Sequence, residues 1–98
     1  MTSPFDSNPG LRYERLYVVY EGERGAIVHL HRVLVYEGSE ETTEEQDHEQ
    51  ALHLARRMGH GKQNLLTIPV DPRDFDITVR HRVDLDTRRL VPDQPAET

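Results

Sequence analysis

Two apolar stretches separated by a short glycine-flanked turn constrain the fold of this chain more than any other feature. Residues 12–21 (RYERLYVVYE) and 26–38 (AIVHLHRVLVYEG) are rich in valine and tyrosine, which favour strands. Between them, Gly22 and Gly25 flank Glu23 and Arg24, a pattern typical of a tight hairpin. We therefore expect an antiparallel hairpin in which residue 21 faces residue 26, unless a β-bulge shifts the register.

This register makes both faces of the hairpin mostly apolar. One face carries His29 opposite Val18 and His31 opposite Leu16, together with Tyr20, Ile27, Val33 and Val35. The other face carries Arg15 opposite Arg32, together with Tyr13, Tyr17, Val19, Val28, Leu30, Leu34 and Tyr36. An antiparallel sheet with one solvent-exposed face should carry polar side chains on that face. Because neither face of this hairpin is polar, we expect both faces to be buried against other elements. A single predicted helix can cover only one of them, which predicts a homodimer or another protein partner.

The helix is predicted after an acidic run at residues 37–49. Thr43 and Gln46 form a capping-box pattern, and acidic side chains suit the first turn of a helix. The helix should extend to about Met58, with Gly59 after its end. Its apolar stripe comprises Ala51, Leu52, Leu54, Ala55 and Met58.

The remaining segments complete a small α+β domain. Residues 64–70 read as a short strand that Pro69 restricts to a sheet edge. Residues 76–86 alternate between apolar and polar side chains, and residues 90–91 suggest a short return strand. We predict a ββαββ order: a small antiparallel or mixed sheet of four to five strands with one helix packed on one face. The single domain should span residues 11–91, between a flexible lead (1–10) and a flexible tail (92–98).

Composition excludes several classes of function. The chain has 98 residues, a formal net charge of −6 and no cysteine. The acidic balance argues against binding to duplex DNA or to anionic membranes, and the missing cysteines exclude disulfides and thiolate metal sites. No segment resembles a signal peptide or a membrane span, so a cytoplasmic location is expected. An acidic nucleic-acid mimic is one further alternative.

The histidines offer one possible site. His29 and His31 share a strand face, His81 lies on the apolar side of residues 76–86, and His48 falls within the helix stripe. If they converge, neutral imidazoles could bind zinc or another late first-row metal. Glu14, diagonal to His31, could orient that ring. Separate imidazoles hydrogen-bonded within the fold explain the pattern more simply, so no cofactor is predicted.

The tyrosines and arginines of the opposite face offer another site. Tyrosine and arginine are enriched where proteins bind one another. Stacking of single-stranded nucleic-acid bases is an alternative use of such a face, which the acidic net charge disfavours. The interface candidates are Tyr13, Arg15, Tyr17, Leu30, Arg32, Leu34 and Tyr36.

Four arginines near the C-terminus form a candidate anion site, namely Arg80, Arg82, Arg88 and Arg89. A solvated face balanced by Asp76, Asp84 and Asp86 explains these arginines more simply. The chain contains none of the nucleophile-elbow, dinucleotide or calcium-loop motifs. The sequence therefore predicts a non-catalytic interaction or regulatory module that dimerises through one face of its sheet. A histidine-dependent metal protein or metalloenzyme is the alternative.

Overall fold

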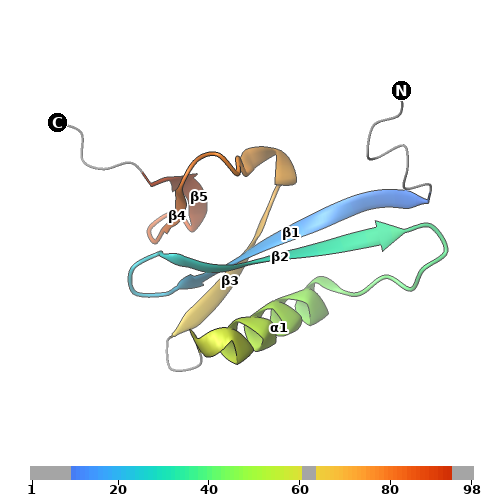
Figure 1. Ribbon diagram of the computed structural model, residues 1–98, viewed down its shortest axis with the longest axis horizontal. Helices are drawn as coiled ribbons and strands as arrows, with labels where there is room; N and C mark the ends of the chain where they lie inside the picture. The colour runs from blue at the N-terminus through green and yellow to red at the C-terminus, as the bar shows by residue number, and fades with distance from the viewer. Residues whose placement is uncertain (1–9, 61–63, 94–98) are drawn as a thin grey trace.

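The computed structural model describes residues 10–60 and 64–93, which form an α+β fold of five strands and one α-helix. Strands β1 (Leu11–Glu21), β2 (Ile27–Tyr36) and β3 (Leu65–Val70) form an antiparallel sheet in the order β2-β1-β3. Strands β4 (His81–Asp84) and β5 (Arg89–Pro92) form a separate antiparallel pair. Helix α1 (Glu44–Ala55) lies on one side of the three-stranded sheet (Figure 1). This arrangement confirms the predicted fold class, with the strands divided between two sheets.

Strand β1 supplies the centre of the fold because it is paired on both edges and covered on both faces. Residues 16–21 of this strand are all buried. On the helix side, Val19 packs with Ala51, Ala55 and Leu65. On the opposite side, the buried cluster is Val18, Tyr20 and Val83, and it is joined by Ile27, Leu30, Ile68, Val70 and Leu90.

A β-bulge in the first hairpin corrects the predicted register. Tyr20 pairs with Ile27 as expected, but Val19 pairs with His29, so Val28 is the extra residue. From His29 to Val35 the β2 residues are displaced by one position, and Tyr17 lies opposite His31. A second irregularity between Leu11 and Tyr13 returns Tyr36 to its predicted partner, Leu11. A one-residue slip exchanges the faces of a strand. The histidines therefore share their face with Tyr17 and Val19, and not with Leu16 and Val18 as the sequence predicted.

The second face of the sheet is covered by β4 and β5, which corrects the premise that this chain could cover only one face. The contact centres on the hairpin turn, where the Val83 amide donates to the Gly25 carbonyl at 2.9 Å. Ala26 also forms an isolated bridge with Arg82. Val83 is fully buried against β1 as a result. The chain's own strands therefore cover the face for which the sequence predicted a partner.

Helix α1 begins as predicted. Thr43 is the N-cap, its hydroxyl accepts from the Gln46 amide, and the Gln46 side chain accepts from the Thr43 amide. The α-helix ends at Ala55 and continues as a π-helical turn to His60, with Gly59 at φ 104°. Because this wider turn follows Ala55, Met58 leaves the predicted stripe and is 63% exposed.

The predicted strand at residues 76–86 is shorter than its alternation suggested. The Asp76 carboxylate accepts hydrogen bonds from the Thr78 amide and hydroxyl at 2.9 and 2.6 Å, which holds residues 76–79 in a turn. Such local side-chain bonds compete with strand pairing. Pairing starts only at His81, and Ile77 is 87% exposed.

The two predicted terminal segments can be compared with the structure only at their inner ends. The predicted flexible lead (1–10) and tail (92–98) lie almost entirely outside the described residues. Across residues 10–60 and 64–93, no helix is long and apolar enough to cross a membrane.

Candidate functional site

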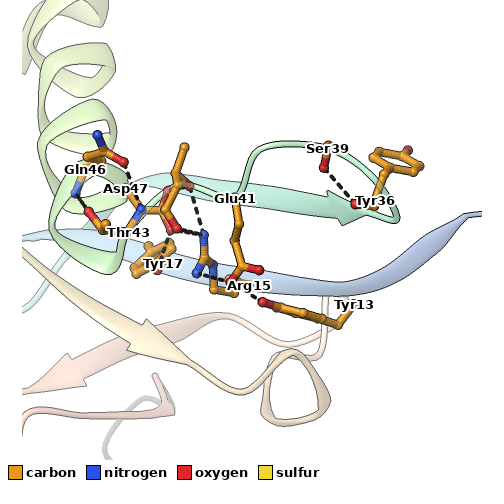
Figure 2. Close-up of polar contacts among 10 residues, drawn as sticks. Tyr13, Arg15, Tyr17, Tyr36, Ser39, Glu41, Thr43, Gln46 and Asp47 are labelled. Carbon is orange, nitrogen blue, oxygen red and sulfur yellow. Dashed lines mark hydrogen bonds and ion pairs between the residues drawn. The ribbon is translucent and has the colours of Figure 1, made fainter.

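A buried polar cluster joins the start of α1 to the middle of β1 (Figure 2). The Asp47 carboxylate is its centre and is only 3% exposed. Its Oδ2 accepts from the Tyr17 hydroxyl at 2.7 Å and lies 2.9 Å from Arg15 Nη2. Its Oδ1 accepts from the Thr42 hydroxyl at 2.5 Å. Three donors therefore satisfy one buried carboxylate, as a buried charge requires.

The cluster extends through the segment that precedes α1. Arg15 Nη2 donates to the Thr42 carbonyl at 2.8 Å, and the Tyr13 hydroxyl donates to Glu41. Burial and the hydrogen bond to Asp47 raise the pKa of Tyr17, which keeps its phenol protonated. These side chains are hydrogen-bonded to one another, so the cluster fixes the helix on the sheet.

A cleft of about 470 Å³ opens beside this cluster, between β2 and the first turns of α1. His31, Arg32 and Val33 line its strand side. Thr42, Gln46 and Gln50 line its helix side, with Asp47 at its base. The helix side therefore presents neutral amide and hydroxyl groups, because the one carboxylate is already paired.

The cleft lies along an edge strand. Within the described residues, β2 pairs with β1 on one side, and the sheet order leaves its other side without a neighbouring strand. The two ends of this edge are flanked, by β4 beside Ala26 and by residues 39–42 beside Val33–Val35. The bulge at Val28 interrupts the strand between Ala26 and His29, so the regular open stretch begins at His29. It ends at Val33, which borders both the cleft and the segment 39–42. An unpaired strand of this kind presents a row of backbone donors and acceptors.

The structure brings together some of the histidines that the sequence singled out. The ring centroids of His29 and His31 are 6.0 Å apart, and His48 packs edge-on against Tyr17 at 4.9 Å. His81 lies apart from them on β4, stacked on Phe75. In the described ranges, no group of three or more histidine, aspartate or glutamate side chains is arranged to hold a metal ion.

Burial makes the paired histidines sensitive to acid. Desolvation lowers the pKa of His29 and of His31, while the nearby Asp47 carboxylate partly opposes the shift at His31. His31 and His60 add to the lowering at His29, whose Nε2 is buried with no hydrogen-bond partner among the described residues.

We expect the free energy of unfolding to fall as the pH drops below about 6.5, the ordinary histidine pKa. The unfolded chain then takes up protons that the folded chain resists, so stability is complete above this pH and declines below it. Urea unfolding at pH 7.5 and 5.5 measures the change. His29→Asn should weaken the dependence, whereas substitution of the exposed His53 by Gln should leave it intact. Equal stability at both pH values would contradict the prediction.

The structure divides the seven interface candidates between the two sides of the sheet. Tyr13, Arg15 and Tyr17 alternate along the helix side, where the polar cluster occupies them and Tyr17 is only 1% exposed. Leu30 joins the opposite core cluster. The other candidates are Arg32 opposite Leu16, Leu34 opposite Glu14, and Tyr36 opposite Leu11 at the far end of the hairpin.

This division removes the single tyrosine–arginine face that the sequence suggested. Arg15 lies opposite Val33, and Arg32 forms an ion pair with Glu14 at 3.2 Å. The two arginines therefore do not face each other, and each has its own acidic partner.

The four C-terminal arginines are likewise separated. Arg88 and Arg89 border a cavity of about 330 Å³ beneath β3, together with Asp71 and Asp74. Arg82 lies 3.9 Å from Asp93, and Arg80 is exposed before β4. One of these acids, Asp71, is already paired with Arg73 at 2.7 Å.

Sequence reasoning missed the central residue of the polar cluster, Asp47. The capping box locates this residue one turn into α1, but its partners Tyr17 and Arg15 lie about thirty positions earlier. The sequence also does not show which face of the hairpin the helix covers, and the structure places the helix on the face that carries Arg15 and Tyr17. A residue with two strand partners so distant in sequence carries no local signal.

Comparison of the chain with known protein families, with curated proteins and with solved structures finds no match.

Proposed function

We propose that the protein is a non-catalytic interaction module that binds another polypeptide strand along the open edge of β2. The observation that carries the proposal is the coincidence of an unpaired strand edge, His29–Val33, with the cleft beside α1. In strand addition, backbone hydrogen bonds supply affinity and an adjacent cleft selects side chains. The binding surface is thus the edge of the sheet, in place of the face that the sequence analysis favoured.

The polar cluster supports this role because it holds the two walls of the cleft together. Asp47 on α1 is tied to Tyr17 and Arg15 on β1, so the helix cannot move away from the sheet without breaking buried hydrogen bonds. A preformed cleft costs a ligand less ordering entropy than one that must assemble on binding. The same hydrogen bonds leave these groups without a catalytic task.

Selection from a library of extended peptides displayed on a carrier tests the proposal. Selected peptides should slow amide hydrogen exchange within residues 29–33 of β2 and shift the NMR signals of Gln46 and Gln50. Binding should weaken in Arg32→Glu and persist in Arg80→Glu, which makes the same change of charge on an exposed residue outside the cleft. Peptides that protect another surface, or none, would contradict the proposal.

A further inference from the structure

The open edge of β2 differs in charge from the rest of the molecule. The chain carries a net charge of −6, yet residues 27–36 contain no aspartate or glutamate. Their one formal charge, Arg32, is neutralised within the same chain by Glu14 at 3.2 Å. Two acidic molecules can therefore approach each other along β2 without bringing strand carboxylates together.

The cleft beside this edge favours an uncharged strand. Gln46, Gln50 and Thr42 present neutral groups, and the carboxylate of Asp47 already has three donors. An incoming charge would find no free counter-charge there and would lose its hydration. A strand of mostly apolar side chains with neutral imidazoles meets this requirement, and β2 itself is such a strand.

We propose that the strand bound at this edge belongs to a second copy of the chain, so that β2 pairs antiparallel with β2 of that copy about a two-fold axis at His31. This inference rests on the proposed function and names its partner. The pairing joins two three-stranded sheets into one continuous sheet. It places the two α1 helices on the same side, with their clefts adjoining.

The axis follows from symmetry and from what flanks the edge. Directly opposed residues in an antiparallel pair point to the same side of the sheet. A two-fold axis between two copies of one strand must therefore pass midway between a residue and the same residue of the second copy. An axis at Arg32 would set two guanidiniums face to face, which is unfavourable. Because the open stretch runs from His29 to Val33, the axis falls on its central residue, His31. Leu30 then faces Arg32 of the second copy.

The absence of cysteine from the sequence makes this register directly testable. Opposed residues of an antiparallel pair have Cα atoms about 4.5–5.5 Å apart, within reach of a disulfide. We expect His31→Cys to give a covalent dimer on mild oxidation. Arg32→Cys alone should form no disulfide-linked dimer under the same conditions, because Cα of residue 32 lies two residues along the strand from its counterpart in the second copy. A mixture of Leu30→Cys with Arg32→Cys should give the mixed dimer.

Measurements on the unmodified chain keep the proposal falsifiable if a cysteine variant fails to fold. Light scattering at micromolar concentrations should give the mass of a dimer. Arg32→Glu should raise the dimer dissociation constant by about tenfold or more, and Arg80→Glu should leave it unchanged.

A chain that stays monomeric at every concentration would overturn this inference. The proposed function would survive that result if library peptides still protected residues 29–33, and it would fail only if they did not. Self-crosslinking of Arg32→Cys in place of His31→Cys would overturn the register.

Discussion

Replacement of Asp47 by alanine should destabilise the protein by about 3–5 kcal/mol, the cost of removing one partner from a buried ion pair. The substitution removes the hydrogen-bond acceptor of Tyr17 and the buried acidic partner of Arg15. The Tyr17 hydroxyl lies on a side chain that is 1% exposed and would have no acceptor. Arg15 would keep only Glu41, at 3.4 Å, as its acidic partner. Because small domains are stable by only about 5–15 kcal/mol, this loss is a large share of the total.

Urea unfolding monitored by far-ultraviolet circular dichroism measures this effect. Glu45→Ala is the matched control, since Glu45 is an exposed carboxylate in the same first helical turn and its loss should cost about 1 kcal/mol or less. Tyr17→Phe should cost about 1.5–3 kcal/mol, and its effect should shrink when Asp47 is already alanine. Additive effects of the two substitutions, or an Asp47→Ala variant as stable as Glu45→Ala, would refute the central role of this carboxylate.

Replacement of Gly25 by alanine should detach β4 and β5 from the sheet. The backbone at Gly25 has φ +78°, and an added Cβ would lie 2.2 Å from the Val83 carbonyl oxygen. A side chain there cannot coexist with the hydrogen bond from the Val83 amide to Gly25. We expect a loss of about 3 kcal/mol or more, since the clash adds to the strain of a left-handed backbone. Amide hydrogen exchange should accelerate throughout β4 and β5.

The chain provides a control that separates strain from clash. Gly38 has a similar φ of +83°, but nothing lies within 4 Å of the position its Cβ would take. Gly38→Ala should therefore cost about 1–2 kcal/mol from backbone strain alone. Exchange in β4 and β5 should remain slow in this variant. If Gly25→Ala lowered stability and accelerated exchange no more than Gly38→Ala, the hydrogen bond between Val83 and Gly25 would not be what holds the two sheets together.

The elements that could be predicted from the sequence are those specified by neighbouring residues. Thr43 and Gln46 locate the start of α1 because the capping box needs only a span of four residues. Pro69 identifies β3 as an edge strand for an equally local reason. The two glycines around residues 22–25 likewise specify the first turn.

The features that sequence reasoning missed depend on single-residue or long-range events. The bulge at Val28 is one extra residue, yet it transfers both histidines to the other face. The turn that Asp76 makes with Thr78 overrides a clean alternation of apolar and polar side chains. The candidate cleft could not be predicted from the sequence, because it depends on the corrected register of β2 and on the position of α1 on the sheet.

The central position of β1 also governs how this protein avoids aggregation. Residues 16–20 (LYVVY) form an uncharged segment of strong strand formers, the composition that stacks into cross-β fibrils when exposed. In the native sheet this segment is shielded by β2 and β3 on its edges and by α1 and β4–β5 on its faces. Arg15 and Glu21 bracket it with charge, as gatekeeper residues do. Conditions that open the covering layers therefore expose the most aggregation-prone part of the chain.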